Sequence, residues 1–251
     1  MIYCMLQDGP IGEDTFGSNM SQAHNYYNWI YQTLSPAIGK RLVEIGVGSA
    51  PFINLYPALE YYFPADVDPE MVRAAEQSWI MKHGSPSQVK GIVGDAGQKD
   101  FWAAVKECRP DCIIAVNVLE HIEDDNYFIV QAREALLPEK GRLVLFVPAL
   151  PSIYGTMDAA AGHFRRYTRQ GIQQMVLRAG FKIKTLSYFN SLGVLPWYYQ
   201  GRIKKTEDLT DQGLNQNILL YDRFGVPITR VLDVAFRGLL GQSLVLIAEA
   251  V

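Results

Sequence analysis

Short apolar runs alternate with segments that place apolar residues at helical spacing along most of the chain. The apolar runs, bounded by turn-forming or charged residues, predict β-strands at residues 41–46, 60–65, 89–94, 111–117, 142–150, 182–190 and 243–251. The segments between them predict helices at residues 21–34, 51–57, 69–83, 99–109, 128–137 and 168–180. Strands that alternate with helices indicate an α/β fold with a doubly wound, mostly parallel sheet.

Capping residues and prolines define several of the predicted helix ends. Ser21 is suited to cap the first helix, and Pro69 to open the helix that runs to residue 83. The helix at 51–57 is expected to be short, because Pro51 suits a first helical turn whereas Pro57 ends or kinks a helix.

The segment 191–240, between the last two predicted strands, is too long for a plain connection and is rich in aromatic and charged residues. We expect a helical cap or substrate-binding insertion within a single domain that spans residues 1–251. Ile228 and Val231 share one helical face, which indicates packing on the sheet. The alternative is that this face forms a lid over an apolar acceptor or contacts a membrane surface. Residues 1–38 are expected to form an N-terminal helical lid segment.

The turn after the first predicted strand carries the most specific pattern. Residues 42–50, LVEIGVGSA, form an apolar run around Glu44 that ends in Gly46 and Gly48. Glycines let a ligand approach the backbone closely. The dinucleotide-binding fingerprint needs a third glycine three residues after the second, where this chain has Pro51, so a nicotinamide or flavin site is disfavoured. The stretch instead resembles the first motif of the class I S-adenosylmethionine (SAM)-dependent methyltransferases.

The resemblance extends to the end of the second predicted strand. Asp66 lies there in the stretch ADVDPEMV, and the resemblance implies that its carboxylate binds the ribose hydroxyls of SAM. Asp68 competes for this role, and can instead cap the helix that begins at Pro69. Ala50 departs from the third glycine of many family members, but alanine is small and the turn is expected to survive.

Two further turns match the family in order. In Gly-Asp-Ala after the third strand, the resemblance implies that Asp95 contacts the adenine amino group and that the Ala96 backbone lies nearby; an Asx turn is the alternative for Asp95. The stretch VNVLEHI resembles the fourth motif, which implies that backbone carbonyls around Asn117 meet the methionyl ammonium of SAM. Glu44 is expected to act through another residue or a water molecule, or to pair with a backbone amide or a basic group.

Together these motifs imply the Rossmann-like methyltransferase fold, with seven strands of which the last is antiparallel. They also imply SAM as the cofactor and S-adenosylhomocysteine (SAH) as the product. The sulfonium methyl is already activated, so such a protein mainly aligns the acceptor with the methyl and excludes water.

The loop after the fifth strand, residues 151–168, is where the family commonly builds its acceptor site. His163 in this loop and His121 after the fourth strand are candidate general bases, although a lone histidine in a loop is more often a structural hydrogen-bonding group. The candidate substrate-binding residues are Tyr154, Arg165, Arg166, Tyr167 and Trp197.

The two adjacent arginines leave two interpretations open. An arginine presents a planar fork that suits a carboxylate or phosphate group of an acceptor. Alternatively, Arg165 or Arg166 pairs with Asp158 and holds the loop. Because neighbouring side chains point in different directions, only one of the two arginines is expected to face the site.

Composition narrows the possible partners. The formal charge of −3 and the pI near 5.8 give no basic footprint for nucleic acid. No apolar run reaches the ~18 residues of a membrane span, so stable membrane insertion is not expected, and no signal peptide is apparent. The odd number of cysteines, Cys4, Cys108 and Cys112, has no paired spacing, which indicates a reduced, cytoplasmic protein without a metal site.

The sequence therefore predicts a SAM-dependent methyltransferase for a small-molecule acceptor such as a sugar, a lipid or a secondary metabolite, with transfer to oxygen slightly favoured over nitrogen or carbon. An aminopropyltransferase of the same fold, with Asp124 and Asp125 as its only hint, is one alternative. A non-catalytic SAM-binding or scaffold protein is the other. A homodimer remains open.

Overall fold

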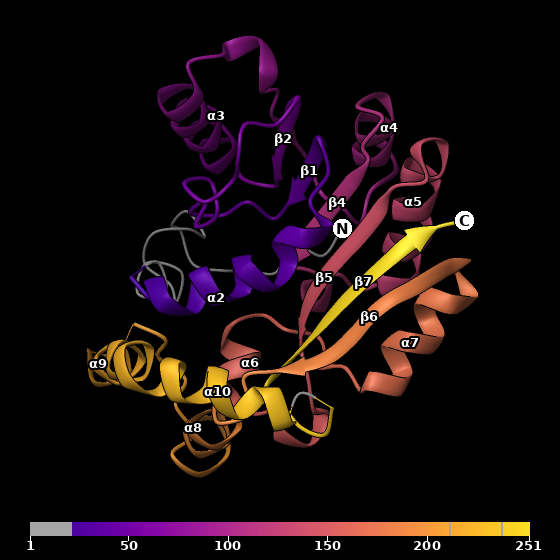
Figure 1. Cartoon of the computed structure of the whole chain (residues 1–251). Helices are drawn as coiled ribbons and strands as arrows, with labels where there is room; N and C mark the ends of the chain where they lie inside the picture. The colour runs from indigo at the N-terminus through magenta and orange to yellow at the C-terminus, as the bar shows by residue number, and fades with distance from the viewer. Residues whose placement is uncertain (1–21, 211, 237) are drawn as a thin grey trace.

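A seven-stranded sheet forms the centre of the part of the chain that the structure describes (Figure 1). The structure is a computed structural model, and it describes residues 22–210, 212–236 and 238–251. The strands are β1 Arg41–Ile45, β2 Tyr61–Asp66, β3 Ile92–Val93, β4 Cys112–Val116, β5 Arg142–Pro148, β6 Phe181–Phe189 and β7 Ser243–Ala250. Their order is β3-β2-β1-β4-β5-β7-β6. β1 to β5 pair in parallel, whereas β7 runs antiparallel to both β5 and β6.

Helices cover both faces of this sheet. The α-helices are α2 His24–Leu34, α3 Pro69–His83, α4 Lys99–Glu107, α5 Asp125–Leu136, α6 Thr156–Ala160, α7 Arg169–Arg178, α8 Val194–Tyr198, α9 Gln212–Leu220 and α10 Val226–Phe236. The short 3₁₀ helices are η1 Ser35–Ala37, η2 Pro86–Gln88, η3 Leu119–His121, η4 Leu137–Glu139 and η5 Pro151–Ile153, and the π-helical turns are η6 Tyr199–Ile203 and η7 Tyr221–Gly225. This is the doubly wound fold that the strand–helix alternation predicts.

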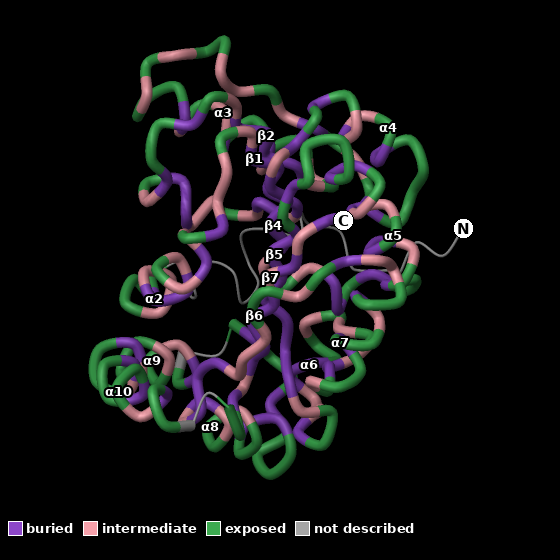
Figure 2. The backbone as a smooth tube through the Cα atoms, turned by 45° about the vertical axis from the view of Figure 1, so that its right-hand side comes forward, coloured by how far each residue is buried: buried purple, intermediate pink, exposed green. Residues whose placement is uncertain are grey.

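The central strands divide their side chains between two apolar layers, because successive residues of a strand point to opposite faces. On β1, Val43 and Ile45 pack in the layer that holds α4, α5 and α7, with Trp102 at its centre. Leu42 points the other way, into the layer formed with α2 and α3, where Trp79 is fully buried. Figure 2 shows the result as a buried set of strands flanked by helices whose outer sides are exposed.

Two predicted elements differ from the structure. Residues 51–55 form consecutive turns and no helix, because Ala50 enters with a left-handed φ of 53° and the flanking prolines cannot donate to a helical ladder. The predicted strand at 89–94 is reduced to Ile92–Val93 with an isolated bridge at Val89. The reason is that the Gly91 N–H donates to Glu76 Oε1 at 2.6 Å and so leaves the ladder.

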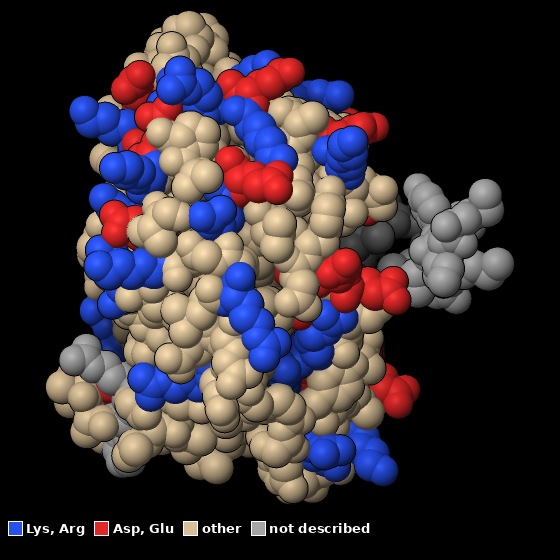
Figure 3. All heavy atoms as spheres, turned by 90° about the vertical axis from the view of Figure 1, so that its right-hand side faces the viewer, with Lys and Arg blue, Asp and Glu red and all other residues tan. Residues whose placement is uncertain are grey.

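The helix predicted at 21–34 begins at His24, with Ala23 at the N-cap position and no side-chain cap of its own. The predicted cap Ser21, Cys4 and the first part of the predicted lid lie outside the described residues. Within the described ranges, no helix is long and apolar enough to cross a membrane. On the face drawn in Figure 3, basic and acidic side chains are interspersed, so this face presents no field of a single sign.

The segment between β6 and β7 contains α8, α9 and α10 and lies with α2 at the end of the sheet from which β7 begins (Figure 1). Because β7 is antiparallel to β5, this is the end at which the parallel strands finish. Asp222 of η7 supplies the cap that α2 lacks: its carboxylate accepts from the backbone N–H of Asn25 at 3.2 Å and of Tyr26 at 2.8 Å. The first helix and the late insertion are therefore joined through a buried carboxylate.

The prediction that Ile228 and Val231 pack on the sheet is wrong. These side chains of α10 are 56% and 73% exposed, because the helix turns the opposite face, with Val226 and Thr229, inward.

Replacing Asp222 with alanine is expected to lower the free energy of unfolding by about 2 kcal/mol, because it uncaps α2 and removes a charge-assisted bond to the backbone. Chemical denaturation of the two proteins measures this difference. The exposed Asp208, which accepts from Thr210 in its own turn, is the matched control, and Asp208→Ala should leave the free energy of unfolding close to that of the parent protein. Equal losses in the two variants would contradict the capping role.

Candidate functional site

The turn after β1 requires glycine at its first position and is open at its second. Gly46 has a φ of 73°, and a Cβ there would lie 2.3 Å from Val118 Cγ2. Gly48 has a φ of 48°, and a Cβ there would meet nothing within 4 Å. The N–H groups of Gly46 and Val47 donate to Ala65 O at 2.7 and 3.1 Å, which fixes the turn against the end of β2. Gly46 thus provides close packing, whereas Gly48 provides open space beside the backbone.

The two acids after β2 have different partners. Asp66 is half-buried; its Oδ2 accepts from the Gly48 N–H at 2.9 Å and its Oδ1 from the Asp68 N–H at 3.1 Å. Asp68 is the N-cap of α3 and accepts from the Glu70 N–H at 2.8 Å. Asp68 therefore has the helix-capping role that the sequence left open for it, while Asp66 faces the glycine turn.

The other predicted cofactor turns adjoin this pair. Asp95 comes shortly after β3. The residue between them, Gly94, donates its N–H to Asp66 O at 2.9 Å. The Asp95 carboxylate is exposed and accepts from the Gly97 N–H at 2.7 Å, which is an Asx turn. The indole N–H of buried Trp102 donates to Ala96 O at 2.8 Å and holds this turn against the core.

Asn117 lies where β4 ends. It has a left-handed φ of 53°, and its N–H donates to Phe146 O at 2.8 Å. The next residue, Val118, is the side chain against which Gly46 packs. The structure therefore brings the turns after β1, β2, β3 and β4 together at one edge of the sheet, as expected for the carboxyl ends of parallel strands.

Glu44 lies beneath the glycine turn and is buried. The Tyr62 hydroxyl donates to its Oε2 at 2.6 Å. Burial raises the pKa of Glu44 to about 7, although the Tyr62 hydrogen bond acts in the opposite direction. The partner of Glu44 is thus a tyrosine of β2 and not the backbone amide or basic group that the sequence left as an alternative.

Replacing Glu44 with glutamine is expected to make stability less dependent on pH. Folding raises the pKa of Glu44 from 4.5 to about 7, so the native protein binds a proton that the unfolded chain has released, and stability falls as the pH rises through this window. For this buried group the loss is about 3 kcal/mol. Urea unfolding at about pH 5 and pH 8 measures it. Glu107→Gln, at an exposed position, should retain the pH dependence of the parent protein, and the same slope in Glu44→Gln would refute the assignment.

Asp158 organises the loop after β5. Its carboxylate accepts from Arg166 Nε at 2.7 Å, from Trp197 Nε1 at 3.1 Å and from the Gly155 N–H at 3.0 Å, and lies 3.1 Å from His163 Nδ1. Burial acts to raise the pKa of Asp158, but these partners outweigh it and hold the pKa below its usual range. The Arg166 side chain is 1% exposed, so it forms the loop-holding pair with Asp158 that the sequence left as an alternative to acceptor binding.

Arg165 points in a different direction from Arg166. Its guanidinium pairs with Asp125 Oδ2 at 2.8 Å and donates to Glu123 O. The hydroxyl of buried Tyr167 also contacts Asp125, at 3.2 Å, and donates to Leu119 O at 3.1 Å. Arg165 and Tyr167 therefore meet on one carboxylate at the start of α5.

Tyr154 contacts one residue of a histidine pair that His121 and His163 form. The Tyr154 hydroxyl donates to His163 O at 2.8 Å. The rings of His121 and His163 lie edge to face with centroids 4.8 Å apart. Desolvation of the ring by its neighbours and the nearby His163 lower the pKa of His121 to about 4, so its imidazole is neutral at pH 7, although the residue as a whole is exposed.

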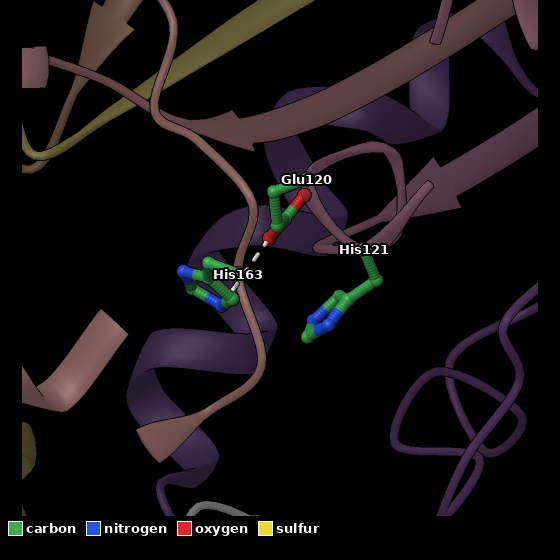
Figure 4. Close-up of side chains that lie close together, drawn as sticks. All are labelled: Glu120, His121 and His163. Carbon is green, nitrogen blue, oxygen red and sulfur yellow. Dashed lines mark ion pairs between the residues drawn. The ribbon is translucent and has the colours of Figure 1, made fainter. Parts of the chain in front are cut away.

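Glu120 is a site residue that the sequence analysis missed. It is 0% exposed, and its Oε1 lies 3.8 Å from His163 Nε2 (Figure 4). Burial raises the pKa of Glu120 to about 8. The available signal was its place in Leu-Glu-His directly after β4, at the ligand edge of the sheet.

The glycine turn, the acid after β2 and the turns after β3 and β4 lie together at the edge of the sheet where the methyltransferase motifs were predicted, and the sequence comparison identifies the same family. A family model described as a methyltransferase domain matches residues 21–186, and the chain belongs to this family, within the class I SAM-dependent methyltransferases. No curated protein matched the chain by sequence.

Solved structures show the same fold at low identity. A SAM-dependent methyltransferase from Mesorhizobium loti is 14% identical, with a TM-score of 0.57, and the match covers 89% of this chain and 97% of that one. Geranyl diphosphate C-methyltransferase from Streptomyces coelicolor A3(2), in complex with Mg²⁺, geranyl diphosphate and SAH, is 11% identical, with a TM-score of 0.62 and coverage of 97% and 86%. Phosphoethanolamine N-methyltransferase 2 from Haemonchus contortus, in complex with SAM, is 15% identical, with a TM-score of 0.57 and coverage of 95% and 58%.

The residues present fit SAM, the cofactor of this class. Open space beside Gly48 lets a ligand approach the backbone. Asp66 has lone pairs left after its two backbone bonds. Asp95 is exposed at the same edge.

Proposed function

We propose that this protein transfers a methyl group from SAM to a small-molecule acceptor, with an acceptor oxygen slightly favoured over nitrogen or carbon. The observation that carries the proposal is the turn at Gly46 and Gly48. Gly46 packs against Val118, the Gly48 N–H donates to Asp66, and the space beside Gly48 is open. The open space beside Gly48 contributes nothing to the packing of the core. A glycine backbone at a sheet edge that is open to close approach is what a bound nucleoside requires.

Each cofactor residue has a proposed role. The Asp66 carboxylate accepts from the ribose hydroxyls, Asp95 with the Ala96 backbone recognises adenine, and backbone carbonyls around Asn117 accept from the methionyl ammonium. Glu44, in the strand that leads into the turn, stabilises it through the hydrogen bond from Tyr62. When bound, SAM supplies a methyl carbon on a positively charged sulfur.

The acceptor lies, in this proposal, beside the histidine pair. With Nδ1–H of His163 directed at Asp158, its Nε2 carries the lone pair and can take the proton of an acceptor hydroxyl. The acceptor oxygen forms its bond to the methyl carbon while the carbon–sulfur bond breaks. His121 is the second candidate base. Tyr154 reaches this region by donating to His163 O, and the insertion 191–240 reaches it through the contact of Trp197 with Asp158. Arg165, on the Asp125 side, is the third proposed acceptor residue.

The two acids that hint at an aminopropyltransferase both have structural partners. Asp124 caps α5 by accepting from the Tyr127 N–H at 2.9 Å, and Asp125 pairs with Arg165, which favours methyl transfer over this alternative. Cys108 and Cys112 are free thiols in the buried part of the protein, which supports the proposal that it works in the reducing cytoplasm.

Calorimetric titration with SAM and SAH tests the proposal first, and micromolar binding of both is expected. Methyl transfer from labelled SAM is then measured with hydroxylated sugars and lipids, with geranyl diphosphate and with phosphoethanolamine, because the fold serves carbon and nitrogen acceptors in the proteins named above. Absence of SAM binding would refute the proposal. Binding without turnover on any acceptor would favour a scaffold.

A further inference from the structure

Three potential ligand atoms converge beside the proposed acceptor volume. Glu120 and His121 come from η3, directly after β4, and His163 comes from the loop after α6. One carboxylate oxygen and one nitrogen from each histidine lie within 4.8 Å of one another. Figure 4 shows the Glu120 carboxylate directed at His163, with the His121 ring on the neighbouring side.

Glu120 has no hydrogen bond that would explain its burial. Its side chain is 0% exposed, and neither Oε1 nor Oε2 has a hydrogen-bond partner in the described part of the chain; His163 Nε2, at 3.8 Å from Oε1, lies beyond hydrogen-bond distance. A buried carboxyl group without a hydrogen bond is costly and rare, and such a group calls for a bound ligand.

His163 is already arranged as a cation ligand. Its Nδ1 lies 3.1 Å from Asp158 Oδ1, so a proton on Nδ1 leaves the lone pair on Nε2, the atom that lies 3.8 Å from Glu120 Oε1. Histidines that bind metals usually donate the other ring N–H to a carboxylate in this way. Asp158 is itself held by Arg166, which fixes the orientation of the ring.

We infer that Glu120, His121 and His163 bind one divalent transition-metal cation. Two imidazoles and one carboxylate are a ligand set for Zn²⁺, Fe²⁺ or Co²⁺, whereas Mg²⁺ prefers oxygen ligands. With bonds of about 2.1 Å, tetrahedral donors lie about 3.4 Å apart. From the 3.8 Å separation the donors need to close by about 0.4 Å, and from the 4.8 Å limit by at most about 1.4 Å. Three protein ligands leave a position for water or an acceptor.

Cation binding at these three residues does not depend on methyl transfer, but its role in catalysis does. The Nε2 lone pair of His163 serves either as a base or as a ligand. In the metal-bound protein, coordination of the acceptor hydroxyl lowers its pKa and takes over the task assigned above to a histidine base. This part alone rests on the proposed methyl transfer.

Calorimetric titration of the untagged, chelator-treated protein with Zn²⁺ tests the site, with the visible absorption of Co²⁺ as a second measurement. One equivalent should bind at micromolar or lower concentration, and Mg²⁺ should not match it. His121→Ala and His163→Ala should each weaken Zn²⁺ binding by at least about 10-fold. His24→Ala, an exposed histidine of α2, should leave it unchanged.

His121 is exposed, so its replacement leaves the core intact and keeps the test valid if changes at Glu120 or His163 prevent folding. Far-UV circular dichroism checks this for each variant. No saturable Zn²⁺ binding by the parent protein, or equal binding by His121→Ala, would overturn the inference. A titration with SAM on the same preparation separates this failure from a failure of the proposed function.

Discussion

Replacing Asp66 with alanine is expected to weaken SAM binding by at least about 100-fold. Two hydrogen bonds from ribose hydroxyls to a carboxylate are worth roughly 3 kcal/mol or more together, and about 1.4 kcal/mol corresponds to a factor of ten. The change also removes the acceptor of the Gly48 N–H, so the glycine turn loses part of its support. Calorimetric titration with SAM gives the affinity directly.

Asp68→Ala is the matched control for this experiment. Asp68 lies two residues away and caps α3, so its loss should lower the free energy of unfolding by about 1 kcal/mol and leave SAM affinity within a factor of about three. If Asp68→Ala weakened SAM binding and Asp66→Ala did not, the ribose contact would have to be reassigned to Asp68.

Replacing Arg166 with methionine is expected to lower the free energy of unfolding by about 3 to 5 kcal/mol. The Arg166–Asp158 pair is fully buried, with side-chain exposures of 1% and 0%, and removing one partner leaves an uncompensated charge in the protein interior. The guanidinium also donates to Ala149 O at 2.8 Å and lies over the Trp197 ring at 4.9 Å. Chemical denaturation at neutral pH measures the change.

Arg165→Met tests the same chemistry at the adjacent position. The Arg165 side chain is 31% exposed and its pair with Asp125 is partly solvated, so a loss below about 1 kcal/mol is expected. Losses of similar size at the two positions would contradict the assignment of Arg166 to the buried pair. They would also reopen its role in binding an anionic acceptor.

Most of the fold could be predicted because its signals are local. The apolar runs that became β1, β4, β5 and β7 are buried on both faces, as strands at the centre of a sheet covered by helices on both sides must be. The missing helix at 51–55 and the shortened β3 depended on particular backbone groups. The Gly91 N–H pairs with Glu76, fifteen residues earlier, and no periodicity in the sequence records such a bond.

The turns proposed to bind SAM could be predicted through the family resemblance. The arrangement of the loop after β5, where the acceptor is proposed to bind, could not. The sequence could place two arginines beside Asp158 but could not choose between them, because the direction of each side chain depends on how the loop packs on β5. Glu120 was overlooked because an acid within an apolar stretch becomes informative only when its burial and lack of partners are known.

The position of β7 has a consequence for biosynthesis. The methyltransferase-domain match ends at residue 186, yet β7 Ser243–Ala250 lies between β5 and β6 and pairs with both. At ~5–20 residues per second, the ribosome needs roughly 5 to 20 seconds to proceed from the end of β5 to the end of β7. For that time the nascent chain exposes an apolar strand edge, which makes it a client for chaperones and makes a fragment truncated at the domain-match boundary prone to aggregation.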